Sequence, residues 1–157
     1  MKREKIMKKL EGNLNAKGMK IGFVVTRWNS FVVDHLVKGA IETVERHGGS
    51  TDNIRQVMVP GAFELPLAVE KMAASGQYDA IVALGAVIQG GTPHFDFVAS
   101  EAAKGVAQVA MDSGLRAGIA QLYSYCVNGG VFTSADQGFA CLGYQRLIDA
   151  TSCHNSP

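Results

Sequence analysis

Short apolar runs alternate along this chain with stretches whose apolar residues recur every three or four positions. An uninterrupted apolar run predicts a strand that is covered on both faces, as in a parallel sheet. Two runs of this kind occur, at Ile21 to Val25 and Ala80 to Ile88, and Ile54 to Val59, which contains Arg55 and Gln56, is predicted as a further strand that ends before Pro60-Gly61. This alternation predicts the α/β class, because each strand is followed by a helix that can carry the chain back across the sheet.

After each of the three predicted strands, apolar residues recur every three or four positions, which predicts a helix. The first helical stretch has Ser30 as its expected N-cap and ends near His47-Gly48-Gly49. The second runs from about Leu65 to Ser75-Gly76, and the third from Phe95 to Ser113. Three consecutive strand-then-helix units predict a central parallel sheet flanked by helices.

The last part of the chain has a different composition. Residues 116–157 contain all three cysteines and few charged side chains, and no periodicity persists there for long. Leu122 to Val127 is a candidate fourth strand, and Gln145 to Ala150 is a candidate short helix. We expect one domain over residues 1–157, with 1–18 as an N-terminal arm and 116–157 as an atypical C-terminal region.

Charge and cysteine usage limit the classes of partner. The formal net charge of +1 offers no broad electrostatic attraction for nucleic acid or for an anionic membrane surface. No apolar stretch has membrane-spanning length, and the basic N-terminus is not followed by a signal-peptide apolar region. An odd number of cysteines without CxxC spacing favours reduced thiols and a cytoplasmic protein, and no cluster has metal-ligand spacing.

The junction from Gly85 to Asp96 combines glycines, a threonine and a histidine between the third predicted strand and the third helix. His94 is expected at the start of that helix, where an imidazole can take and give a proton near neutral pH. The alternative is that His94 only caps the helix. Gly90, Gly91 and Thr92 precede it and would let a phosphate approach the helix N-terminus, although such a turn is often only a turn.

Residues after the other two strands lie where ligand-contacting loops belong in a parallel sheet. Trp28-Asn29 follows the first predicted strand, and Ala62-Phe63-Glu64 follows the second. An aromatic ring beside an amide or carboxylate would bind a flat polar heterocycle. The structural alternatives are core packing for Phe63 and first-turn dipole compensation for Glu64.

Taken together, these segments resemble the lumazine synthase family, over residues from about 11 to 115. The resemblance is carried by four ordered segments: Glu11-Gly12-Asn13-Leu14, Arg27-Trp28-Asn29, Val59-Pro60-Gly61-Ala62-Phe63-Glu64-Leu65-Pro66 and the junction from Gly85 to Asp96. It implies a three-layer flavodoxin-like fold, assembled as a homopentamer or as an icosahedral 60-mer, with the pocket between neighbouring subunits.

The resemblance also implies a reaction. Family members condense 5-amino-6-(D-ribitylamino)uracil with 3,4-dihydroxy-2-butanone 4-phosphate to 6,7-dimethyl-8-ribityllumazine, in riboflavin biosynthesis, with no metal or organic cofactor. Trp28 would stack on the pyrimidine and His94 would move protons, while Gly91 and Thr92 would hold the phosphate. The remaining substrate contacts would be Ala62, Phe63, Glu64, Ala86, Val87 and Ile88.

The resemblance stops where the composition changes. Family members continue with a strand that bears a substrate-facing phenylalanine and with a helical region that contains a phosphate-binding arginine, and residues 116–157 do not reproduce these. A frameshifted or rebuilt tail is one hypothesis for the difference. A second functional hypothesis is therefore a catalytically impaired member that acts as a shell or ligand-binding protein.

Overall fold

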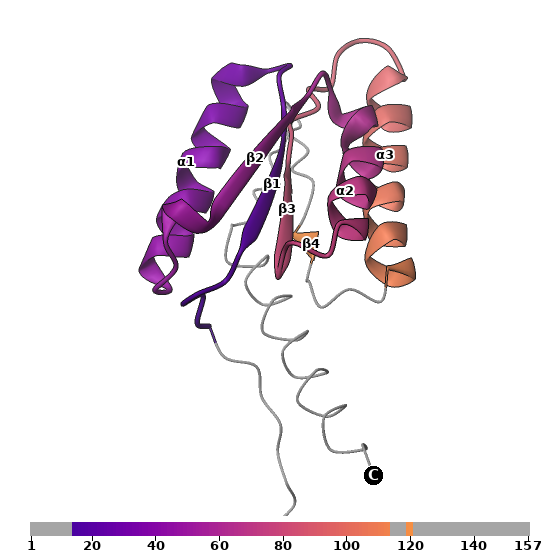
Figure 1. The fold of residues 1–157 in the computed structure, drawn as a ribbon. Coiled ribbons are helices and arrows are strands. Elements are labelled where there is room, and N and C mark those ends of the chain that lie inside the picture. Colours follow the sequence, from indigo (N-terminus) through magenta and orange to yellow (C-terminus); the bar gives the residue numbers. More distant parts are fainter. Residues whose placement is uncertain (1–13, 114–118, 121–157) are drawn as a thin grey trace, which may run out of the picture.

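The computed structural model describes residues 14–113 and 119–120 (Figure 1). Within these ranges, four strands and three α-helices follow one another in an alternating order. The strands are β1 (Ile21–Thr26), β2 (Ile54–Val59), β3 (Ala80–Leu84) and β4 (Ile119–Ala120). The helices are α1 (Ser30–Arg46), α2 (Leu65–Ala74) and α3 (His94–Asp112), with short 3-10 turns η1 (Thr51–Asn53) and η2 (Ala62–Glu64).

The strands form a parallel sheet in the order β2-β1-β3-β4. β1 lies between β2 and β3, and all six of its residues are buried, which explains the uninterrupted apolar sequence from Ile21 to Val25. β2 lies at the end of the described sheet and has exposed side chains, including Val57 and Met58 at 38% and 43% of their full exposure.

Helices cover both faces of the sheet, α1 on one side and α2 with α3 on the other (Figure 1). Two apolar cores result. Phe23 and Val25 of β1 belong to the core beside α1, and Val24 between them belongs to the core beside α2 and α3. The prediction of a three-layer α/β fold with a central parallel sheet is confirmed.

The third strand is shorter than its apolar run predicts. β3 ends at Leu84, and Gly85 to Val87 leave the strand although they remain buried, while Ile88 forms an isolated bridge. A buried apolar run has the same sequence pattern whether or not its backbone pairs with a neighbour, so the pattern alone overestimates the strand.

The start of one helix differs from the prediction, because the N-cap of α1 is Asn29 rather than Ser30. The helix α3 begins at His94, where that residue was expected, one residue before the apolar spacing that starts at Phe95. Capping preferences do not separate Asn from Ser, so the choice depends on the backbone conformation at the end of β1. The described fourth strand is Ile119–Ala120. The predicted strand from Leu122 to Val127 and helix from Gln145 to Ala150 lie outside the described residues.

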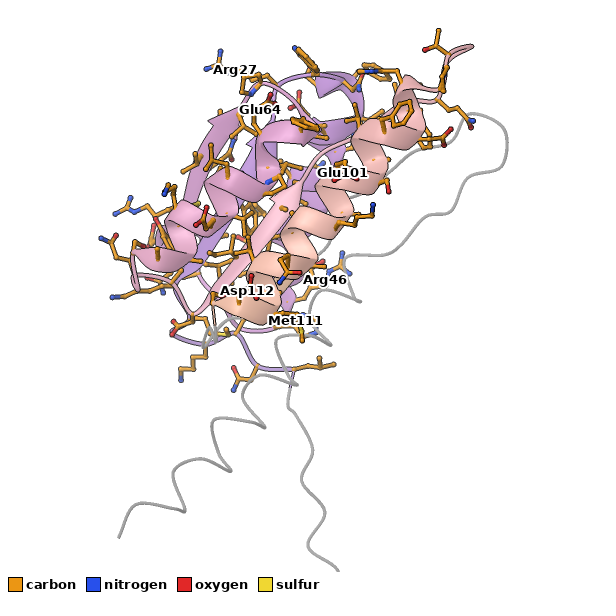
Figure 2. The ribbon with its side chains drawn as sticks, turned by 90° about the vertical axis from the view of Figure 1, so that its right-hand side faces the viewer. Arg27, Arg46, Glu64, Glu101, Met111 and Asp112 are labelled. Carbon is orange, nitrogen blue, oxygen red and sulfur yellow. The ribbon has the colours of Figure 1, made fainter. Side chains whose placement is uncertain are left out.

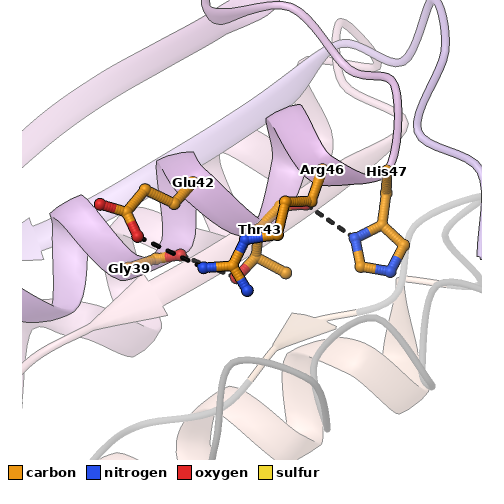
Figure 3. Close-up of polar contacts among 5 residues, drawn as sticks. All are labelled: Gly39, Glu42, Thr43, Arg46 and His47. Atoms are coloured by element: carbon orange, nitrogen blue, oxygen red, sulfur yellow. Dashed lines mark hydrogen bonds and ion pairs between the residues drawn. The ribbon is translucent and has the colours of Figure 1, made fainter.

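The C-terminal end of α1 is closed by polar contacts far from the carboxyl ends of the strands (Figure 3). The Thr43 hydroxyl donates to Gly39 O at 2.7 Å, and His47 Nδ1 lies 2.7 Å from Thr43 O. Arg46 and Glu42 form an exposed ion pair at 3.4 Å. His47 therefore has a structural partner at the end of this helix.

The described part of the chain contains neither a candidate membrane-spanning helix nor a cluster of side chains that suits a metal ion. No helix within it is long and apolar enough to cross a membrane. Residues 14–113 hold no group of three or more His, Cys, Asp or Glu side chains that suits a metal ion, and the three cysteines lie outside the described ranges.

Candidate active site

The carboxyl ends of β1, β2 and β3 meet at one edge of the sheet, the upper edge in Figure 1. The predicted site residues follow these three strand ends, and α3 begins at the same edge. Figure 2 shows Arg27 and Glu64 at one end of the molecule, and Met111 and Asp112 at the other. Parallel strands bring their carboxyl ends together, so segments far apart in sequence share this edge.

Trp28 packs its ring against the loop that follows β2. Its backbone N–H donates to Pro60 O at 3.1 Å. A Cβ placed on Gly61 would lie 2.6 Å from the Trp28 Cε3 atom, so the six-membered part of the indole ring rests directly on the glycine backbone. The side chain is still 65% exposed. One ring face is supported by the protein while most of the ring stays accessible, which suits a stacking platform.

Replacing Gly61 with alanine is expected to displace the Trp28 ring. The added methyl group would lie within 3 Å of two ring carbons, and the exposed ring can rotate away more easily than the backbone can move. We expect the Trp28 fluorescence maximum to shift, with the free energy of unfolding changed by about 1 kcal/mol or less. Unchanged emission would show that the ring does not depend on Gly61. Trp28 is the single tryptophan, so the signal is unambiguous.

The segment after β2 forms the short turn η2 and leads directly into α2. Ala62 is buried, whereas Phe63 is 63% exposed, so the structural alternative of core packing for Phe63 is wrong. The Glu64 Oε2 atom accepts a hydrogen bond from Gly61 N at 2.9 Å. This is half of a capping box, and it ties the carboxylate to the start of the turn that leads into α2. Glu64 therefore has a local structural role, and its second oxygen faces no described partner.

The segment after β3 is held to the end of β1. Asn29 Nδ2 donates to Ala86 O at 2.8 Å across 57 residues of sequence. Ala86 and Val87 are buried and Ile88 is half-buried, so this segment presents little side-chain surface. Gly85 before it is in close contact with Thr26 and Leu65.

Gly90, Gly91 and Thr92 form an exposed approach to α3, and His94 is the first residue of that helix. A Cβ on either glycine would meet no described atom within 4 Å, and neither glycine has a positive φ. His94 is exposed, and its ring has no hydrogen-bond partner among residues 14–113. The described contacts therefore do not support the alternative that His94 only caps the helix.

Sequence reasoning missed the supporting roles of three residues in this region. Gly61 and Gly85 allow close packing, and Asn29 connects the ends of two strands through its side-chain amide. A glycine directly after a buried apolar run is a sequence signal for close approach, and it marks Gly85; Gly61 follows Pro60 and an exposed strand and carries no such signal. The Asn29 contact has no comparable local signal.

The fold and the candidate site define an α/β protein of the flavodoxin-like type whose ligand-contacting loops lie at the carboxyl edge of a parallel sheet. The family model of 6,7-dimethyl-8-ribityllumazine synthase matches residues 18–122. The chain belongs to this family.

Relatives named 6,7-dimethyl-8-ribityllumazine synthase resemble most of the chain. The protein from Desulfovibrio desulfuricans is 53% identical over 116 residues, which cover 74% of each chain. Proteins from two strains of Nitratidesulfovibrio vulgaris, DP4 and Hildenborough, have the same identity and coverage. The family match continues to residue 122, past the limit near 115 drawn from the motifs, and so includes β4.

Proposed function

We propose that this chain is a cytoplasmic transferase that condenses 5-amino-6-(D-ribitylamino)uracil with 3,4-dihydroxy-2-butanone 4-phosphate to give 6,7-dimethyl-8-ribityllumazine in riboflavin biosynthesis. The observation that carries this proposal is the meeting of three family motifs at one edge of the sheet. Trp28 rests on Gly61 there, and Asn29 bonds to Ala86. Neither the described contacts nor the relatives favour the alternative of a shell or binding protein without activity.

The chemistry requires orientation and proton transfer but no redox step. The pyrimidine amine adds to the butanone carbonyl, and loss of water gives an imine. Removal of a proton then allows inorganic phosphate to leave, and the second amine closes the ring with loss of a second water. Each step moves protons between nitrogen, carbon and oxygen, which is work for a group that can act as acid and as base.

The heterocycle is proposed to lie between the Trp28 ring and the segment from Ala86 to Ile88. The exposed indole offers a flat apolar face. Val87 and Ile88 offer main-chain groups, because little of their side chains reaches the surface. The ribityl chain is proposed to contact Ala62, Phe63 and Glu64, with the second Glu64 carboxylate oxygen as an acceptor for a hydroxyl group.

The phosphate is proposed to bind at Gly91 and Thr92. The open space around Gly90 and Gly91 means that packing within the described structure does not require glycine there, whereas close approach of a phosphate to the backbone does. The N-terminus of α3 follows two residues after Thr92 and adds its partial positive charge. His94 begins the same helix, so its imidazole is proposed to accept and donate the protons that are transferred when the phosphate leaves.

A direct assay tests the proposed activity. Purified protein is mixed with both substrates, and product formation is followed by the absorbance of the lumazine. We expect a rate well above that of the two substrates without protein. A rate equal to that of the protein-free mixture would contradict the proposal.

We propose a homopentamer, alone or within an icosahedral 60-mer, as the active assembly. Large apolar side chains are exposed on the described surface, and Phe31 and Phe97 are each 68% exposed. A groove of about 470 Å³ also lies between α1 and β2, the end strand of the described sheet, and its lining combines Val37, Ile41 and Met58 with Asp34, Lys38, Glu42 and Gln56. Contiguous exposed apolar side chains often mark a surface that contacts another chain.

Solution mass tests this assembly. Light scattering on the purified protein is expected to give the mass of a pentamer or of a larger shell of pentamers. The measurement is best made on the sample used for the activity assay. An active monomer would contradict the proposal, because a monomer cannot complete a pocket between subunits.

A further inference from the structure

Asn29 has a backbone conformation that few residues adopt. Its φ of 59° and ψ of 38° lie in the left-handed region, and it is the one residue other than glycine with positive φ among residues 14–113. Asparagine tolerates this conformation better than most side chains. The Asn29 carbonyl accepts from Val32 N at 2.9 Å and from Val33 N at 3.0 Å, so the residue begins α1 through its backbone.

The side chain of Asn29 is not used for capping. An asparagine at an N-cap usually accepts a hydrogen bond from the first turn of its own helix. Asn29 makes no such bond, and its Nδ2 instead donates to Ala86 O at 2.8 Å. A carbonyl oxygen only accepts, so the amide nitrogen must face it. The left-handed backbone thus sends the amide toward the end of β3.

This bond reaches a segment that the sheet does not hold. β3 ends at Leu84, and residues 85–87 have no described strand pairing. Ala86 is only 5% exposed, so its carbonyl needs a partner within the protein. Trp28, the neighbour of Asn29, is tied through its N–H to Pro60 O and through its ring to Gly61. The short turn after β1 therefore links the carboxyl ends of β1, β2 and β3.

We propose that Asn29 is a positioning residue that sets the spacing between the Trp28 ring and the Ala86 to Ile88 segment, and thereby the fit of the pyrimidine substrate. The inference rests on the proposed function for the identity of that substrate. It assigns the amide of Asn29 to Ala86 O rather than to a ligand. The butanone phosphate, proposed to bind at Gly91 and Thr92, does not depend on this spacing.

Asn29→Asp is the decisive variant. Aspartate has the same size and also tolerates the left-handed region, but its carboxylate cannot donate to Ala86 O and is repelled by it. We expect KM for the ribitylaminouracil to rise about tenfold and KM for the butanone phosphate to stay within about twofold. Trp28 fluorescence anisotropy in the substrate-free protein is expected to fall, because the turn beside the ring is released.

Two further variants separate positioning from folding. Asn29→Gly removes the side chain, and glycine adopts the left-handed backbone conformation readily. If Asn29→Asp does not fold, the KM values and anisotropy of Asn29→Gly show whether the Asn29 side chain is a positioning group. Ser30→Ala changes the adjacent exposed residue, which makes no described side-chain bond, and should leave both KM values and the anisotropy unchanged. Circular dichroism checks the fold of each variant.

The experiments distinguish a failure of the proposed reaction from a failure of the proposed role of Asn29. If the wild-type protein forms no lumazine, the proposed function fails, and the anisotropy of Trp28 alone decides whether Asn29 positions the ring. Equal rises in both KM values, or wild-type KM values and anisotropy in Asn29→Asp and Asn29→Gly, would overturn the inference.

Discussion

Replacement of His94 by alanine is expected to lower kcat by about a hundredfold, with KM for both substrates little changed. His94 begins α3 beside the proposed phosphate position, and an imidazole there can take and give the protons that the condensation moves. The expected loss is at the low end for general acid–base catalysis because His94 is exposed, so water can take over part of the proton transfer.

The measurement is the initial rate of lumazine formation at saturating concentrations of both substrates. His35→Ala is the matched control, because His35 is also exposed but lies on α1, and its removal should leave kcat unchanged. A wild-type kcat in His94→Ala would remove His94 from the mechanism. A rise in KM for the butanone phosphate without a loss of kcat would assign the residue to phosphate binding instead.

Replacement of Gly85 by valine is expected to lower the free energy of unfolding by about 3 kcal/mol, the upper end for overpacking in a core. A Cβ at this position would lie 2.8 Å from Thr26 Cγ2 and 3.1 Å from Leu65 Cδ1. Both neighbours are almost completely buried, at 1% and 0% exposure, so neither can move aside. The backbone at the end of β3 must shift, and the Ala86 to Ile88 segment shifts with it.

Denaturant unfolding followed by circular dichroism measures this loss. Gly85→Ala should show a smaller loss of about 1–2 kcal/mol, because it adds only the first clashing atom. Gly39→Ala is the control within α1, where a Cβ meets nothing within 4 Å, and it should stabilise the protein by about 0.5–1 kcal/mol. A Gly85→Val protein as stable as the wild type would show that the close contact with Thr26 and Leu65 is not rigid.

Much of the fold could be predicted because its signals are local. The predicted strand from Ile54 to Val59 coincides with β2, and the run from Ile21 to Val25 is β1 without its last residue. Burial on both faces of β1 favours apolar residues on both faces, and from Ile21 to Val25 that preference is visible in the sequence. The start of α3 was predicted to within one residue, because the helical spacing of its apolar residues begins at Phe95.

The predicted site residues lie in the three loops that follow β1, β2 and β3, but their contacts could not be predicted. The exposure of Phe63 depends on how η2 turns after β2, and an aromatic residue in a loop has the same sequence pattern whether it is buried or exposed. The ring of Trp28 rests on Gly61 because β1 and β2 pair in a register that places Thr26 beside Val59.

The sequence by itself determined the order of strands and helices, the parallel class of the sheet and the family motifs, because each is encoded within a few neighbouring residues. Only the tertiary structure decided that β1 lies between β2 and β3, and that the Asn29 side chain bonds to Ala86 O. The physical reason is distance along the chain. A hydrogen bond across 57 residues forms only when strand register and a left-handed backbone together bring donor and acceptor to 2.8 Å.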